Sequence, residues 1–301
     1  MLPDFFVIGA AKAGTTALYW YLAEHPAIFM SPIKEPNFFA YGLDERGRLL
    51  YGDPELHRFP VRTREEYERL FAGAGDAAVV GEASAIYLEC PQAAGRIGAA
   101  VPGARIVCGL RDPVDRAYSD YLMHLRSRGN RFDPARDLSP DAAWARPDSH
   151  WMRIGRYAEL LAPYFETFPR DRIHIYLFDD LRRDPLGVVR GVYRFLGVDE
   201  GFVPDLATPH NVGGVPSRML VERLLMNRLA RTTIRPFLPR PVVDAARRLR
   251  ARNLRRPPPL PSAMRARLTE HFREDILATS RLIGRSLDHW LGEESPVPVP
   301  P

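Results

Sequence analysis

The chain has 301 residues, of which 46% are hydrophobic and 10% aromatic, and its formal net charge is +5. This is ordinary globular composition, sufficient for one large α/β domain or two small ones. No stretch approaches the roughly 20 apolar residues of a membrane span, the first residues lack a secretory pattern, and two cysteines cannot form a disulfide framework. These features predict a cytoplasmic protein.

Apolar runs and helical patterns alternate along the first 200 residues. The run at residues 4–8 predicts a buried strand, followed by a turn at residues 9–14 and a helix over residues 15–24. Further strands are predicted at residues 27–31, 77–84, 104–110 and 172–180, helices at 63–71, 111–126, 155–168 and 185–196, and long loops at 40–60 and 129–150. This alternation predicts a parallel sheet with helices on both faces.

From about residue 217 the pattern is helical with proline breaks. We therefore expect one domain over residues 1–292, with residues 217–292 as its helical C-terminal part, and a flexible tail at residues 293–301. Residues 218–285 contain 17 arginines, no lysine and five acidic residues. This segment is a solvated helical face or a surface for an anionic partner, such as a polyanionic substrate or acidic lipid head groups. Nucleic acid is disfavoured, because aromatic residues are not interleaved with the arginines.

Lysine is nearly absent from the chain. Of the 42 basic residues, only Lys12 and Lys34 are lysines. Where arginine serves equally well the chain uses arginine, so the two lysines mark positions that need a compact ammonium group.

The segment GAAKAGTT, residues 9–16, has the glycine spacing of a Walker A loop, but Thr15 stands where the Walker A lysine would be. A strand-to-helix turn of this kind presents backbone N–H groups at a helix N-terminus, where the dipole favours anions. Lys12 lies inside the turn and adds a positive charge. The anion-binding residues expected here are Lys12, Ala13, Gly14, Thr15 and Thr16.

This loop resembles the 5′-phosphosulfate loop of sulfotransferases that use 3′-phosphoadenosine 5′-phosphosulfate (PAPS). Other segments are similar to the carbohydrate, heparan-sulfate-type branch of that family and to its bacterial members, in the expected order. They are KEPNFF (34–39), VGEASAIYL (80–88), LRDPVDRAYSDY (110–121), the run from residue 155 to 185, FLGV (195–198), HNVGGVPSR (210–218) and IGRSLDHWL (283–291). The resemblance covers most of the chain. It implies a single P-loop-like domain and metal-free sulfuryl transfer from PAPS to a hydroxyl, less readily an amine.

The resemblance also assigns roles at the reacting end of the donor. Lys12 would stabilise the charge that develops on the leaving group during an in-line displacement, and Glu35 would take the acceptor's proton. Lys34 would orient the sulfonate or tune Glu35. The alternative for Glu35 is an ordinary ion pair with a neighbouring arginine.

At the other end of the donor, Arg111 and Ser119 would bind the 3′-phosphate. Ser119 falls two helical turns after the predicted cap Asp112, and the guanidinium fork suits a phosphate. Arg218 would also contact the cofactor. The alternative for Arg111 is a salt bridge with a nearby carboxylate.

Two segments depart from the heparan-type pattern and leave the acceptor open: residues 80–88, and the late loop at 210–218, which lacks the K-G-R-x-H pattern. Ala83 stands where carbohydrate enzymes often have lysine, and Ala85 replaces a proline, so a small molecule, a glycan or a lipid remains possible. Two other functions also remain as alternatives. A P-loop small-molecule kinase would use Asp179 and Asp180 as a metal site at the end of a strand, and a non-catalytic protein would bind anions or membranes through its arginines.

Overall fold

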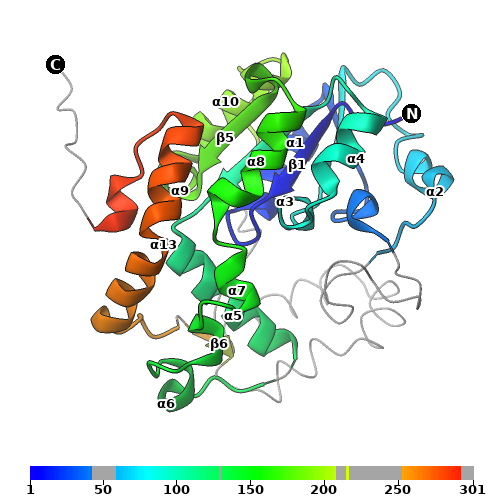
Figure 1. The fold of residues 1–301 in the computed structure, drawn as a ribbon. Helices are drawn as coiled ribbons and strands as arrows, with labels where there is room; N and C mark the ends of the chain where they lie inside the picture. Colours follow the sequence, from blue (N-terminus) through cyan, green and yellow to red (C-terminus); the bar gives the residue numbers. More distant parts are fainter. Residues whose placement is uncertain (43–58, 129, 208–214, 217–252, 256, 293–301) are drawn as a thin grey trace.

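The computed structural model describes residues 1–42, 59–128, 130–207, 215–216, 253–255 and 257–292. Its centre is a five-stranded sheet in which every neighbouring pair of strands is parallel. In spatial order the strands are β2 (Ile28–Met30), β3 (Val79–Ala83), β1 (Phe5–Gly9), β4 (Arg105–Leu110) and β5 (Ile173–Leu177). The predicted parallel α/β fold is therefore confirmed (Figure 1).

Helices cover both faces of this sheet (Figure 1). In β1, Phe5 and Val7 enter one core cluster and Phe6 and Ile8 the other, because successive side chains of a strand alternate between its faces. The helices that pack on the Phe5 face are α1 (Thr15–Glu24) and α10 (Pro185–Leu196). Those on the opposite face are α3 (Ile86–Glu89), α4 (Ala93–Ala100), α8 (Tyr157–Thr167) and α13 (Ser262–Ile283).

Several helices begin where the sequence predicts. Helix α2 (Arg64–Arg69) starts with the capping box of Thr63 and Glu66. Helix α5 (Pro113–Ser127) is capped by Asp112, whose carboxylate accepts the backbone N–H of Asp115 at 2.9 Å. Both starts follow from side-chain acceptors that satisfy N–H groups of the first helical turn.

The strand predicted at residues 172–180 is wrong in its second half. Strand β5 ends at Leu177, and residues 178–183 form helix α9 (Phe178–Arg183). Asp179 and Asp180 therefore lie in the first turn of a helix, where the positive end of the helix dipole stabilises acidic side chains. The apolar run in the sequence carries no sign of this change from strand to helix.

The long loop predicted at residues 129–150 is also corrected. The described part holds three short helical segments, α6 (Pro134–Asp137), η2 (Ala143–Ala145) and α7 (His150–Arg153). Asp133 and Ser149 cap α6 and α7, and these capping signals were present in the sequence. The remaining segments are η1 (Phe38–Ala40), η3 (Arg170–Arg172), η6 (Asp288–Leu291) and the two-stranded pair β6 (Val215–Pro216) and β7 (Leu254–Arg255).

The described residues of the C-terminal part are mainly helical, with the short strand β7 as an exception. Helix α13 has 22 residues and packs against α8 and α5. Arg218 and the tail at residues 293–301 lie outside the described residues. None of the helices within the described ranges is both long and apolar enough to cross a membrane.

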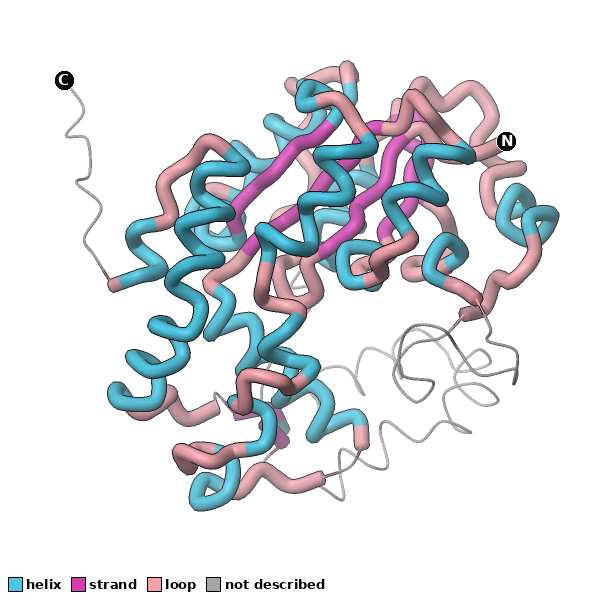
Figure 2. The backbone as a smooth tube through the Cα atoms, in the orientation of Figure 1, coloured by secondary structure: helices cyan, strands magenta, loops and turns pink. Residues whose placement is uncertain are grey.

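Parallel pairing places the carboxyl ends of β1, β3 and β4 at one edge of the sheet (Figure 2). The loop after β1 carries Lys12, the turn after β3 carries Ser84, and Arg111 follows β4 directly. This edge is where open α/β sheets bind their ligands.

Candidate active site

The loop between β1 and α1 adopts a backbone conformation that requires glycine at position 14. Gly14 caps α1 with φ +85°, and a Cβ atom there would lie 2.4 Å from Leu181 Cδ2. Ala13 is fully buried, and its carbonyl accepts a hydrogen bond from the Tyr176 hydroxyl at 3.1 Å. Lys12 has φ 72°, also in the left-handed region. Backbone conformation and close packing therefore both account for the glycine at position 14.

The start of α1 offers donors to an anion. Among the described residues, the backbone N–H groups of Gly14, Thr15 and Thr16 donate to no other protein group. They belong to the first helical turn, whose N–H groups have no partner within the helix. These donors and the Lys12 ammonium therefore fit the phosphosulfate end of PAPS.

The Lys12 ammonium lies in a partly closed environment. Burial lowers its pKa to about 8, an effect opposed by the carboxylates of Asp120 and Glu35 and reinforced by Arg111. Its Nζ lies 3.5 Å from Met123 Sδ. Arg111 is hydrogen-bonded to the Lys12 carbonyl, and Glu35 is hydrogen-bonded to the end of β3, the strand that pairs with β1. The three predicted residues therefore lie at the same edge of the sheet.

Glu35 lies on the segment that follows β2. Its backbone N–H donates to the Ala83 carbonyl at 2.9 Å, at the carboxyl end of β3. Its carboxylate forms an ion pair with Lys34, whose Nζ is 2.6 Å from Oε1. The Glu35 side chain is 49% exposed, so an acceptor can approach it. The ion-pair partner is thus the other lysine of the chain, and not an arginine as the alternative supposed.

A buried network fixes this segment. Glu82 is fully buried and accepts three hydroxyl hydrogen bonds, from Tyr67 (2.7 Å), Ser84 (2.7 Å) and Tyr87 (2.6 Å). Ser84 Oγ accepts the backbone N–H of Asn37 at 3.1 Å, and the Tyr87 oxygen accepts that of Phe39 at 3.3 Å. Glu82 therefore anchors, through two hydroxyls, the backbone that carries Glu35.

Arg111 lies between the loop and α9. Its Nη1 donates to the Lys12 carbonyl at 3.3 Å, and its guanidinium lies 4.7 Å from the centre of the Phe178 ring. Burial lowers its pKa. Ser119 lies on α5 and is half-buried, and its hydroxyl donates no hydrogen bond to Arg111 or to another residue in the described ranges.

A second group of charges was missed from the sequence. Arg116, Asp120 and His124 are buried on one face of α5, and Arg116 Nη2 donates to the Trp151 carbonyl. Asp120 lies 3.6 Å from Arg116 Nη1 and 3.7 Å from His124 Nε2. Their spacing of four residues was the available signal, since it places side chains on one helical face.

Glu89 was missed as well. Its side chain is only 5% exposed, and His150 Nε2 is 4.0 Å from its Oε2. In the part of the chain that the structure describes, this oxygen has no hydrogen-bond partner. Burial raises its pKa to about 8, with a further contribution from Asp120. No sequence pattern pointed to this carboxyl.

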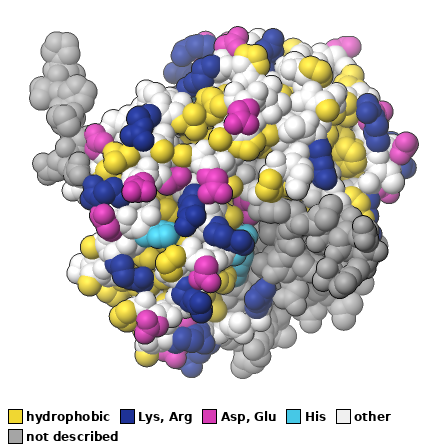
Figure 3. All heavy atoms as spheres, viewed as in Figure 1, with side chains coloured by type: hydrophobic (Ala, Val, Ile, Leu, Met, Phe, Trp, Pro, Cys, Tyr) yellow, Lys and Arg dark blue, Asp and Glu magenta, His cyan; other side chains and the backbone are white. Residues whose placement is uncertain are grey.

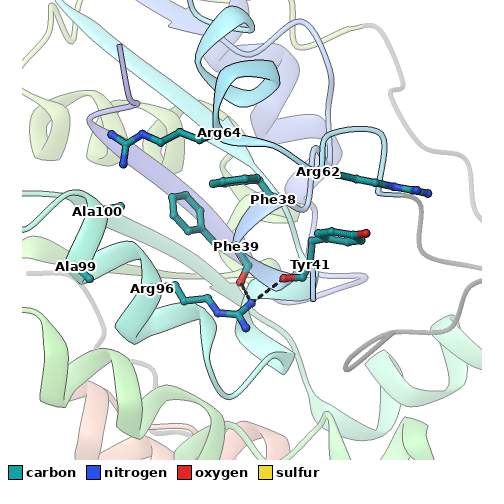
Figure 4. Close-up of a pocket in the computed structure, with 8 residues that line it drawn as sticks. All are labelled: Phe38, Phe39, Tyr41, Arg62, Arg64, Arg96, Ala99 and Ala100. Atoms are coloured by element: carbon teal, nitrogen blue, oxygen red, sulfur yellow. Dashed lines mark hydrogen bonds between the residues drawn. The ribbon is translucent and has the colours of Figure 1, made fainter. Parts of the chain in front are cut away.

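A cavity of about 450 Å³ lies between η1, α2 and α4 (Figure 4). Its lining residues are Phe38, Phe39, Tyr41, Arg62, Arg64, Arg96, Ala99 and Ala100. Arg96 Nη1 donates to the carbonyls of Phe39 (3.0 Å) and Tyr41 (2.9 Å). The cavity contains none of the predicted catalytic residues, but Arg96 steadies the chain beyond Glu35.

The predicted metal-site aspartates have protein partners. Trp290 Nε1 donates to Asp179 at 3.1 Å, and Arg285 pairs with Asp180 at 2.6 Å. Within the described ranges, no group of three or more His, Cys, Asp or Glu side chains could hold a metal ion.

On the face shown in Figure 3, basic and acidic side chains are interspersed over the described surface.

Comparison with known proteins identifies the family. The model of the sulfotransferase family matches residues 3–202. The chain is 30% identical over 312 residues to the bifunctional heparan sulfate N-deacetylase/N-sulfotransferase 4 of Mus musculus, covering 97% of this chain and 31% of that protein. It is 32% identical over 208 residues to the Drosophila melanogaster bifunctional heparan sulfate N-deacetylase/N-sulfotransferase, covering 65% of this chain and 20% of that protein. The chain thus spans about a third of the length of the mouse relative and about a fifth of the length of the fly relative.

A solved structure agrees. The sulfotransferase from Alicyclobacillus acidocaldarius superposes with a TM-score of 0.68 at 30% identity, covering 96% of this chain and 99% of that one. The P-loop kinase alternative is not favoured by these matches. The chain belongs to the sulfotransferase family, whose members transfer a sulfuryl group.

Proposed function

We propose that this enzyme transfers the sulfuryl group of PAPS to an acceptor hydroxyl, with Glu35 as the base and Lys12 stabilising the leaving group. The observation that carries the proposal is the meeting of Lys12, Glu35 and Arg111 at one edge of the sheet. PAPS has an anionic group at each end. Lys12 and Arg111 supply a cation for each end and are joined by a hydrogen bond.

The donor would be held at two positions. The backbone N–H groups at the start of α1, the hydroxyls of Thr15 and Thr16 and the Lys12 ammonium would bind the 5′-phosphosulfate. Arg111 and Ser119 would bind the 3′-phosphate, and Arg218 would add a further contact. The proposed transfer uses no metal, as the resemblance to sulfotransferases that use PAPS implies.

The reaction is an in-line displacement at sulfur. The acceptor oxygen forms a bond to sulfur while the bond from sulfur to the phosphate oxygen breaks, and the phosphate keeps the electron pair. Glu35 takes the acceptor's proton, and the Lys12 ammonium stabilises the negative charge that develops on the bridging oxygen. Lys34, 2.6 Å from Glu35, orients its carboxylate toward the acceptor. Positioning and charge stabilisation supply the catalysis.

An amine acceptor is the second candidate. It is supported by the name of the mouse relative, an N-sulfotransferase of heparan sulfate that matches 97% of this chain. Position 83 is alanine where carbohydrate enzymes often have lysine, so small molecules, glycans and lipids all remain acceptor classes.

We place the reaction in the cytoplasm, since Cys90 and Cys108 are buried free thiols. The arginine-rich segment 218–285 would allow peripheral contact with an anionic surface.

The proposal is tested by incubating the enzyme with PAPS labelled in the sulfuryl group. The acceptor panel pairs each hydroxyl compound with its amino counterpart, and mass spectrometry identifies the product. Transfer to hydroxyl compounds is expected. Exclusive transfer to amines would favour the second candidate, and transfer from a nucleoside triphosphate but not from PAPS would refute both.

A further inference from the structure

Two carboxylates stand beside the proposed 3′-phosphate position. Asp112 caps α5, and Asp115 follows it in the first turn. Asp115 follows Arg111 by four residues, and after burial its charge is the first that acts on the pKa of Arg111. Asp115 also precedes Ser119 by four residues, which places their side chains about 5–6 Å apart on one helical face.

This arrangement opposes the binding of a phosphate. A phosphate monoester carries about −1.5 to −2 charges at neutral pH. An unpaired Asp115 would repel such a group at Ser119 and would compete with it for Arg111. The site therefore needs a cation that neutralises Asp115 without occupying the phosphate position.

Arg265, from the first turn of α13, supplies that cation. Its Nη2 forms an ion pair with Asp115 Oδ1, and its Nη1 lies 3.9 Å from Asp112 Oδ2. The helix that carries it is seated on α5, and nearby the Tyr118 hydroxyl donates to the Pro258 carbonyl at 2.9 Å. Arg265 thus reaches the α5 N-terminus from the arginine-rich C-terminal part, 150 residues away in sequence.

We propose that Arg265 is a positioning residue of the nucleotide site, which pairs with Asp115 and thereby lets Arg111 and Ser119 accept a 3′-phosphate. The inference rests on the proposed function, which assigns the 3′-phosphate to those two residues. It gives a use to one arginine of the C-terminal segment that differs from contact with an anionic surface. It also couples the seating of α13 to the affinity for nucleotide.

The test measures the binding of two nucleotides by calorimetry at low salt. Adenosine 3′,5′-bisphosphate carries the 3′-phosphate, and adenosine 5′-monophosphate lacks it. Arg265→Gln should weaken the bisphosphate about three- to tenfold, an effect that shrinks as salt is added, and should leave the monophosphate unchanged. Arg265→Lys keeps the charge and should retain most of the affinity.

A second substitution separates charge from structure. Adding Asp115→Asn to Arg265→Gln removes the charge that Arg265 neutralises, so the double variant should recover bisphosphate affinity although the ion pair is gone. Arg267→Gln is the matched control, because Arg267 lies on the same helix and donates to the Pro140 carbonyl instead of a carboxylate. This control should bind both nucleotides as the unmodified enzyme does.

Three outcomes would overturn the inference. Arg265→Gln could bind the bisphosphate normally, it could lose affinity for both nucleotides equally, or the double variant could fail to recover. Failure of the proposed nucleotide site itself has a different signature, because the unmodified enzyme would then show no preference for the bisphosphate over the monophosphate.

Discussion

Arg111 donates a hydrogen bond through Nη1 to the backbone carbonyl of Lys12, at 3.3 Å. Arg111 follows β4 and Lys12 follows β1, and these two strands are neighbours in the sheet. The contact joins the two cations proposed to hold the opposite ends of PAPS. The pairing of β1 with β4 therefore sets the distance between these two residues, and with it the spacing of the two anion sites proposed for the nucleotide.

Replacing Arg111 should weaken nucleotide binding. Because a hydrogen bond to a charged group contributes about 1.5–3 kcal/mol, Arg111→Ala should raise the Kd of adenosine 3′,5′-bisphosphate about 10- to 150-fold. Calorimetry measures this change directly. Arg105→Ala is the control, since Arg105 lies at the opposite end of β4 and donates to the Leu196 carbonyl. Equal losses in the two variants would mean that Arg111 acts only through the fold.

Removing the Ser84 hydroxyl should affect both stability and turnover. Ser84→Ala leaves the Asn37 N–H without its acceptor and Glu82 without one of its donors. We expect a destabilisation of about 1–3 kcal/mol by urea unfolding, with a lower kcat because the Glu35 segment loses its anchor. Ser139→Ala, which removes an exposed hydroxyl bonded to the Arg136 carbonyl, should change neither quantity. Unchanged kcat in Ser84→Ala would show that this anchor is dispensable.

Activity should fall in alkaline solution because of Lys12. Its pKa is lowered to about 8, first by burial, so the free enzyme loses the ammonium charge above that pH. The value of kcat/KM for PAPS should therefore decrease about tenfold per pH unit above pH 8. In Lys12→Arg the guanidinium stays charged across this range, so a lower rate without the alkaline fall is expected. An alkaline fall that persists in Lys12→Arg would assign the titration to another group.

Glu89 should make the fold less stable as pH rises. Its pKa is raised from 4.5 to about 8, first by burial, so between these values the folded state keeps a proton that the unfolded state has released. The stabilisation is complete below about pH 4.5 and is lost as pH rises through 8, by an amount on the order of a few kcal/mol.

Glu89→Gln cannot ionise and tests this directly. The free energy of unfolding of the variant minus that of the unmodified protein should be larger at pH 8 than at pH 5, because only the unmodified protein loses stability between these pH values. Glu166→Gln, at an exposed position, should show the same difference at both pH values. A Glu89→Gln variant that behaves like this control would contradict the assignment of the pH-dependent stability to Glu89.

Local signals in the sequence predicted much of the fold. Buried strands appeared as apolar runs, and α5 was marked by Asp112 as its cap and Pro113 in its first turn. The loop at residues 9–16 was recognisable because its glycine is required by backbone geometry, which is a local property. Interactions between neighbours in sequence were thus within reach.

Long-range contacts could not be predicted in this way. The pairing of Arg265 with Asp115 depends on where α13 packs, and the proximity of Glu89 to His150 depends on where α7 packs. The Lys34–Glu35 ion pair is adjacent in sequence, but its geometry depends on the turn that carries it. Such contacts are set by tertiary packing, which the patterns in a single sequence do not reveal.

The central claim is that Glu35 performs the proton transfer while other residues hold the donor. The most direct test is the Glu35→Gln variant, measured both for sulfuryl transfer from labelled PAPS and for the Kd of adenosine 3′,5′-bisphosphate. Gln preserves the size of the side chain and removes its basicity. We predict that transfer is lost while the Kd is unchanged. A Glu35→Gln variant that transfers the label at the rate of the unmodified enzyme would contradict the assignment.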